Sequence, residues 1–94
     1  MAFTEILAIG SGAATSADVT IAAGAAVPFV LKGTLGVIPL HGVVHIQAKG
    51  DDGLYYTVHT LHDGNRSQAV NGPGIFRLSR PVSSGAVGVT HDVS

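Results

Sequence analysis

The chain has 94 residues, of which 46% are hydrophobic and 12% are charged, and its formal net charge is −1. A chain of this length forms one domain, so we expect residues 1–94 to fold as a single β domain. The absence of cysteine excludes disulfides and a cysteine nucleophile, and the near-zero charge gives no long-range attraction for nucleic acid.

Charged residues are half as frequent as the ~25% found in a typical soluble domain. Between Ile6 and Ala48 the only ones are Asp18 and Lys32. Such a surface associates readily, because little repulsion keeps copies apart. Two interpretations are open: a compact domain with few surface charges, or a subunit whose surface is buried in an assembly. We favour the second, because small scaffolds without disulfides or metals are commonly stabilised by oligomerisation.

Neither a targeting segment nor a membrane span is expected. The opening MAFTEIL places Glu5 where a signal peptide is apolar. The longest apolar stretch, residues 35–46, is interrupted by Gly36, Pro39 and Gly42, and is shorter than the ~20 residues of a membrane helix.

Short runs of Val, Ile, Leu, Phe and Tyr alternate with Gly, Pro, Asn and Asp, and no window shows helical periodicity. Turn residues recur about every 8–12 residues, which is typical of an antiparallel β-sandwich or barrel. The predicted strands are Thr4–Ile9, Asp18–Ala22, Val27–Leu31, Val43–Lys49, Leu54–Leu61, Ser67–Val70, Ile75–Ser79 and Ala86–Thr90.

Two segments between these strands carry further signals. Residues 10–17 are predicted to be a loop; GSGAATS within them resembles a phosphate-binding loop, but lacks the lysine and the helix that should follow. The segment Gly33–Gly42 is left open between a strand and a long loop broken at Pro39.

The stretch HGVVHIQAKGDDGLYYTVHTLHDG, residues 41–64, predicts a hairpin whose turn is Asp51-Asp52-Gly53. We expect its register to place His45 directly opposite His59, with Cβ atoms ~5 Å apart. Three roles are open for this pair: an exposed or interface polar contact, which we favour, a metal site assisted by His41 and His62, or a pH-sensitive contact. The histidine spacing matches no established zinc motif.

The segment NGPGIFRLSRP, residues 71–81, predicts a tight turn and then a strand that buries Phe76 and Leu78. Arg77 and Arg80 are expected to point outward, either into an intersubunit salt bridge or simply into solvent. After the last predicted strand, we expect His91-Asp92-Val93-Ser94 to be a polar tail.

The opening MAFTEILAIGSGAATSADVTIAAGAAVPFVL, the turn KGDDGLYY and the segment GPGIFRLSRP resemble small capsid-associated structural proteins of tailed bacteriophages. The resemblance implies a β-sandwich or jelly-roll-like barrel of about seven to eight short strands. It also implies a decoration (cement) protein, often a homotrimer, on the exterior of the capsid. Its partners would be its own copies and the major capsid protein, after synthesis in the host bacterial cytoplasm. The family offers no active-site residues to carry over.

No catalytic motif is present, so we expect no catalytic residue, cofactor, metal ligand or small-molecule substrate, and an enzyme ranks last. Two further classes stay open. One is another virion component, such as a head fibre base, neck or tail protein. The other is a free module that binds sugar or metal, for which Tyr55 and Tyr56 are the available stacking aromatics.

Overall fold

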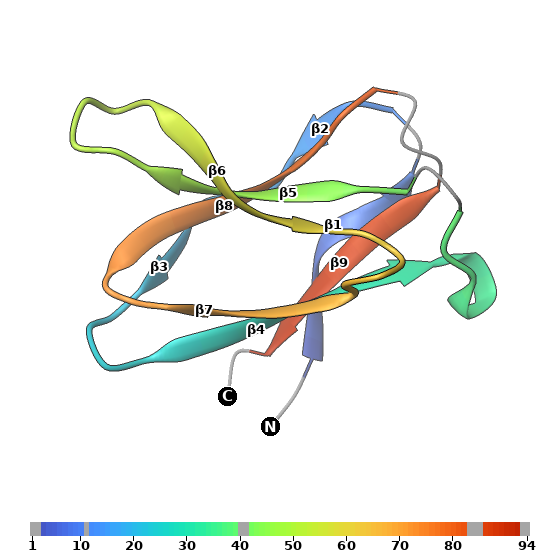
Figure 1. Cartoon of the computed structure of the whole chain (residues 1–94), viewed down its shortest axis with the longest axis horizontal. Coiled ribbons are helices and arrows are strands. Elements are labelled where there is room, and N and C mark those ends of the chain that lie inside the picture. The colour runs from blue at the N-terminus through green and yellow to red at the C-terminus, as the bar shows by residue number, and fades with distance from the viewer. Residues whose placement is uncertain (1–2, 11, 40–41, 83–85, 93–94) are drawn as a thin grey trace.

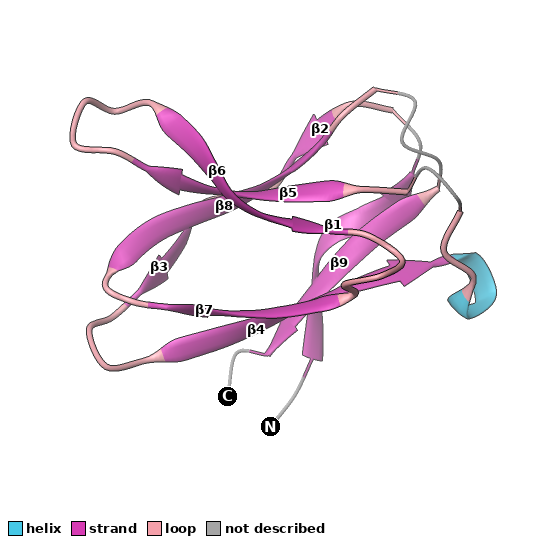
Figure 2. Cartoon of the chain, in the orientation of Figure 1, coloured by secondary structure: helices cyan, strands magenta, loops and turns pink. Residues whose placement is uncertain are grey.

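The computed structural model describes residues 3–10, 12–39, 42–82 and 86–92 (Figure 1). The described chain is almost entirely strand, with a single 3-10 turn, η1 (Thr34–Gly36), as its helical element (Figure 2). The strands are β1 (Phe3–Gly10), β2 (Ala14–Thr15), β3 (Val19–Ile21), β4 (Ala26–Gly33), β5 (Val44–Lys49), β6 (Tyr55–Leu61), β7 (Ser67–Asn71), β8 (Gly74–Arg80) and β9 (Val87–Asp92).

The strands form two antiparallel sheets, which confirms the predicted small β-sandwich. The four-stranded sheet has the order β1-β9-β4-β7. The five-stranded sheet has the order β2-β8-β5-β6, and β3 also pairs with β8, beyond β2. If β2 and β3 are taken as one interrupted edge strand, this is the connectivity of a jelly roll, in which consecutive strands repeatedly cross between the two sheets.

Each predicted strand corresponds to an observed one, but the predicted boundaries fail in two places. The expected loop at residues 10–17 contains β2, which pairs with the end of β8. The last strand also continues past Thr90, so that His91 is a buried strand residue and the predicted polar tail is wrong at this position. Residues 93 and 94 lie outside the described residues.

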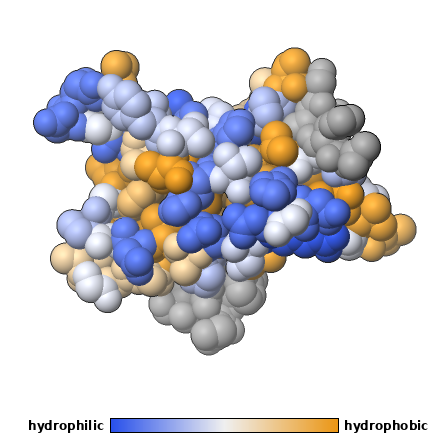
Figure 3. Space-filling model, viewed as in Figure 1, coloured by the Kyte–Doolittle hydropathy of each residue, from blue (hydrophilic) through white to orange (hydrophobic). Residues whose placement is uncertain are grey.

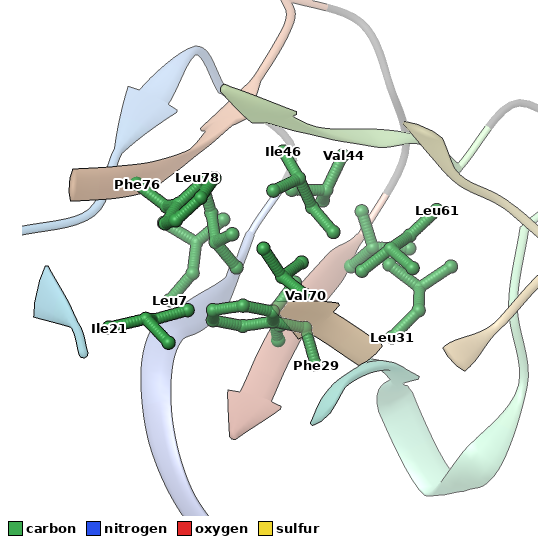
Figure 4. Close-up of a cluster of buried hydrophobic side chains, with 12 residues drawn as sticks. Leu7, Ile21, Phe29, Leu31, Val44, Ile46, Leu61, Val70, Phe76 and Leu78 are labelled. Carbon is green, nitrogen blue, oxygen red and sulfur yellow. The ribbon is translucent and has the colours of Figure 1, made fainter. Parts of the chain in front are cut away.

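The core lies between the two sheets and consists of side chains that alternate along the strands (Figure 4). Burying each large aliphatic or aromatic side chain contributes roughly 1.5–3 kcal/mol relative to leaving it in water. Phe76 and Leu78 belong to this core, as predicted. The members are Leu7, Ile21, Phe29, Leu31, Val44, Ile46, Leu61, Val70, Phe76, Leu78, Val87 and Val89.

The turn of the β5–β6 hairpin forms as predicted. The Gly50 N–H donates to the Leu54 carbonyl over 2.7 Å, and Gly53 has a φ of 84°. The carboxylate of Asp52 accepts the Leu54 N–H over 2.9 Å, which closes the turn on its other side. Glycine adopts such a positive φ without steric cost.

The register of this hairpin is as predicted only near the turn. Gln47 pairs with Thr57, but the next pair is Ile46 with His59, so that Val58 is an extra residue in β6. This β-bulge turns Leu61 toward the core, whereas the predicted register would have pointed it outward. The predicted pairing of His45 with His59 is therefore wrong.

The connections between strands gather at two opposite ends of the sandwich (Figure 1). One end, which we call the η1 end, holds Gly12–Ala13, Thr34–Pro39, His62–Arg66 and Pro81–Val82. The hairpin end holds the turns β3–β4, β5–β6 and β7–β8. Gly33–Gly42 is thus a loop in its described part, since β4 ends at Gly33 and η1 follows directly.

Candidate interaction surface

The described histidines occupy separate environments. His45 pairs with Thr60 across the hairpin, and its Nδ1 lies 3.0 Å from the Thr60 hydroxyl. His59 faces Ile46, so the register places it on the opposite face of the sheet from His45. His62 is exposed, and its Nδ1 accepts the Gly64 N–H over 3.1 Å. Among the described residues, no three or more His, Cys, Asp or Glu side chains are grouped as metal ligands; His41 lies outside them.

A polar network crosses the outer face of the five-stranded sheet. The Tyr55 hydroxyl donates to the Asp18 carboxylate, with oxygen distances of 2.7 and 2.9 Å. The Arg77 guanidinium carbon lies 3.6 Å from the centroid of the Tyr55 ring, and its Nε donates to Gln47 Oε1 over 2.9 Å. The hydrogen bond to Asp18 raises the pKa of Tyr55 above its ordinary value. The network therefore links β6 to the segment before β3 across the intervening strands.

Arg77 is thus already engaged within its own chain, by a cation–π contact and a hydrogen bond. The same contact covers one face of the Tyr55 ring, which reduces the surface available for stacking a sugar. Tyr56 is more exposed, and its hydroxyl donates to the Asp52 carboxylate. The stacking aromatics that a sugar-binding module needs are therefore partly occupied.

Arg80 is buried, contrary to the expectation that it points outward. Its Nε donates to the Gly12 carbonyl over 2.6 Å, and its Nη1 donates to the carbonyls of Ala8 (2.7 Å) and Val87 (2.9 Å). The guanidinium suits this position, because its several donors diverge in one plane. Arg80 therefore holds β1, the β1–β2 loop and β9 together and is not available to a partner.

Exposed apolar side chains lie on two separate connections of the η1 end. Leu35 is 97% exposed, Val37 66% and Val82 70%. Figure 3 shows hydrophobic residues protruding where Figure 1 places η1, beside the hydrophilic β6–β7 turn. On that turn, Asp63 and Arg66 form an ion pair with each other.

The connections that carry these apolar residues contain no charged side chain. Asp, Glu, Lys and Arg are absent from residues 6–17, 33–48 and 81–91 of the sequence. Large exposed apolar side chains that lie together can mark an interaction site, and Leu35 and Val37 lie on one loop. The Thr34–Pro39 loop is therefore the strongest candidate for a binding surface among the described residues.

The backbone holds Leu35 in its exposed position. Leu35 has a φ of 54° and a ψ of 32°, a left-handed conformation that costs roughly 1–2 kcal/mol for a residue with a Cβ. Gly33 is buried so closely against the loop that a Cβ there would lie 1.8 Å from the Val37 carbonyl oxygen. Ile38 then packs against the core and anchors the far side of the loop.

Sequence reasoning missed Leu35, because residues 33–42 were not assigned a structure. One signal was present: Leu35 lies in Gly33-Thr-Leu-Gly36, where closely spaced glycines favour a tight turn and an apolar residue has no neighbouring strand to bury it. Lys32 on β4 and Glu5 on β1, two of the few charged residues in the first half of the sequence, form an ion pair with each other.

Comparisons with protein-family models, with curated proteins and with solved structures find no match to this chain. In the part of the chain that the structure describes, no helix has the length and apolar character needed to cross a membrane. The fold and the surface define the class: a small β-sandwich with jelly-roll connectivity and an exposed apolar loop, Thr34–Pro39.

Proposed function

We propose that this protein is a structural component of a bacteriophage virion, and more specifically a decoration protein on the exterior of the capsid. In this role it acts by contact, as a homo-oligomer of three copies that binds the major capsid protein and holds neighbouring shell subunits together. It performs no catalysis and needs no cofactor.

The observation that carries this proposal is the Thr34–Pro39 loop, where Leu35 is almost fully exposed and no side chain is charged. A protein that works alone in water gains nothing from such a surface, whereas a subunit of an assembly covers it. The sequence resemblance given above supports the same role. Jelly rolls recur among viral capsid proteins, which is support by analogy of fold.

The contacts of such a protein need not be strong one at a time. An interface of ~1,600 Å² is sufficient for a specific complex. Repetition over a closed shell, together with three linked copies, multiplies the effective affinity through avidity. In the proposed role, many weak contacts together attach the protein firmly to the shell.

The test is size-exclusion chromatography with light scattering, followed by co-sedimentation with capsids of the phage that encodes the chain. We expect an oligomer that pellets with the capsids at saturable stoichiometry. Capsids of an unrelated phage serve as the control. A stable monomer that stays in the supernatant with both kinds of capsid would refute the proposal.

A further inference from the structure

β6 is an edge strand of the five-stranded sheet. It pairs with β5 on one side, and no strand of the described chain pairs with its other side. The turn of the β5–β6 hairpin protrudes from the body of the sandwich (Figure 1). An edge strand of this kind offers unpaired backbone N–H and C=O groups to a further strand.

The register near the turn shows which backbone groups are free. The Gly50 N–H donates to the Leu54 carbonyl, and the pairing continues regularly as far as Thr57. Backbone groups alternate in direction along an antiparallel strand, so Leu54 and Tyr56 direct theirs toward β5. Tyr55 and Thr57 therefore direct their N–H and C=O groups away from β5, along the free edge.

The same segment carries a stripe of exposed apolar side chains. Leu54 is 61% exposed, Tyr56 52% and Val58 47%. They occupy alternate positions and so share one face of the hairpin. On that face Ala48, the partner of Tyr56, packs against the core. A further strand on this edge would therefore extend the buried layer of the sandwich.

The edge of β6 lacks the features that usually prevent such pairing, which are charged side chains, proline and irregular geometry. Residues 54–61 contain no charged residue, proline or glycine. The edge strand β1, in contrast, carries Glu5 and two register shifts. The one bulge in β6 begins after Thr57, so the segment next to the turn is regular.

This segment is complementary to itself. In two copies of β6 that run antiparallel about a two-fold axis at Tyr56, Tyr55 of each copy lies opposite Thr57 of the other. The outward-directed backbone groups of the two copies then meet. Leu54 lies opposite Val58 on each side of the Tyr56 pair, so apolar side chains meet apolar side chains.

Other positions of the axis fit less well. An axis at Thr57 would require pairing through the bulge. An axis at Tyr55 would place Thr57 opposite Gly53, which belongs to the turn and not to the strand. The axis at Tyr56 is therefore the one that uses regular strand on both copies.

We infer that the free edge of β6 is an interface between two copies of this chain, which pair antiparallel through residues 54–58 with Tyr56 opposite its own counterpart. A two-fold contact closes on itself, so it joins copies in pairs and does not grow into a fibre. The inference goes beyond the proposed function and does not rest on it. Where three copies form a ring by another contact, this one links two rings.

The first experiment places proline on the free edge. Thr57→Pro removes an N–H that the second copy needs and leaves the hydrogen bonds to β5 in place. Light scattering over a series of protein concentrations should give about half the molar mass of the wild type at the same concentration, because each two-fold contact joins two equal parts.

Ala69→Pro is the matched control. Ala69 is exposed on β7, an edge strand of the other sheet, and the bond from the Gly72 N–H to the Ala25 carbonyl fixes the alternation there. The N–H of Ala69 therefore also points away from its own sheet. This variant should keep the wild-type molar mass. Urea denaturation checks that both proline variants are folded.

The second experiment tests the register. The chain has no cysteine, so Tyr56→Cys introduces a single thiol per copy. The Tyr56 pair is a non-hydrogen-bonded pair with Cα atoms about 4.5 Å apart, a separation that a disulfide can span. With oxidised glutathione as the oxidant, this variant should form disulfide-linked dimers at least about tenfold faster than Leu35→Cys, because only its thiols are held together. Leu35 is 97% exposed, so access does not limit the control.

Each outcome supports or overturns the inference. A wild type that stays a monomer leaves the edge to a strand of a different protein and overturns it, as does a Thr57→Pro variant of wild-type mass. A change of mass in Ala69→Pro alone would place the interface on β7. If Thr57→Pro does not fold, the crosslinking rates of the two cysteine variants decide. None of these measurements uses capsids, so this inference and the proposed function can fail separately.

Discussion

The imidazole of His91 lies parallel to the ring of Phe29, with 6.0 Å between the ring centroids and an interplanar angle of 5°. The two residues are direct partners across β9 and β4, and the His91 Nδ1 lies 3.0 Å from the Thr4 carbonyl oxygen. His91 is therefore an integral part of one end of the core.

Replacement of His91 by alanine should lower the free energy of unfolding by about 2 kcal/mol, because it leaves a cavity beside Phe29. The measurement is urea denaturation followed by circular dichroism. His62→Ala is the matched control and should change stability by at most about 0.5 kcal/mol, since His62 is exposed. Equal effects of the two replacements would contradict the buried position of His91.

Arg80 should be the arginine on which stability depends most. Arg80→Met keeps the apolar stem but leaves the carbonyls of Ala8, Gly12 and Val87 without their donor. We expect a loss of about 3 kcal/mol in urea denaturation, because buried acceptors without partners are costly. Arg66→Met, which breaks only an exposed ion pair, should cost no more than about 0.5 kcal/mol. A wild-type unfolding midpoint for Arg80→Met would show that these bonds contribute little.

Gly33→Ala should destabilise the protein by about 3 kcal/mol, because the added Cβ would lie 1.8 Å from the Val37 carbonyl oxygen and the loop must move. Gly12→Ala is the control, since nothing lies within 4 Å of a Cβ at that position. It should change the unfolding free energy by less than about 0.5 kcal/mol. Thermal or urea denaturation of the two variants tests the prediction, and similar midpoints would rule out the close approach at Gly33.

The hairpin turn should give a distinct acid titration. The Tyr56 hydroxyl and the Leu54 N–H donate to the Asp52 carboxylate, which lowers the pKa of Asp52 below 3.8. Because the folded pKa lies below the unfolded one, the associated stabilisation is present above pH 3.8. It is lost as the pH falls through the folded pKa.

In Tyr56→Phe, the pKa of Asp52 should move up toward 3.8, because the hydrogen bond from the Tyr56 hydroxyl, which lowers this pKa the most, is lost. Carbon-13 NMR of the side-chain carboxyl groups measures this directly. An unchanged Asp52 titration would mean that the tyrosine hydroxyl is not its donor in solution.

The strands and the hairpin turn could be predicted because they depend on local sequence. Period-two alternation identifies the core faces around Phe29 and Phe76, and Asp-Gly at 52–53 identifies the turn. The bulge at Val58 could not be located in this way, because Val58 and Leu61 are both apolar and a regular strand would place them on opposite faces. Only the burial of Leu61, which depends on the opposite sheet, distinguishes the two registers.

The candidate surface was predicted only in general terms. Low charge in the first half indicated a surface to be covered, but not which end of the sandwich would present it. The end at which the Thr34–Pro39 loop lies depends on long-range strand pairing, because β4 before it pairs with β9 and β5 after it pairs with β8. Arg80 illustrates the same limit, because its acceptor Ala8 is distant in sequence and becomes a neighbour only when β1 lies against β9.

The pairing of Phe3 with Asp92 places the first and last described strand positions side by side, away from the η1 end (Figure 1). A foreign polypeptide joined at either position would leave the sandwich without passing Leu35. Added sequence at this corner of the molecule would therefore leave the Thr34–Pro39 loop uncovered.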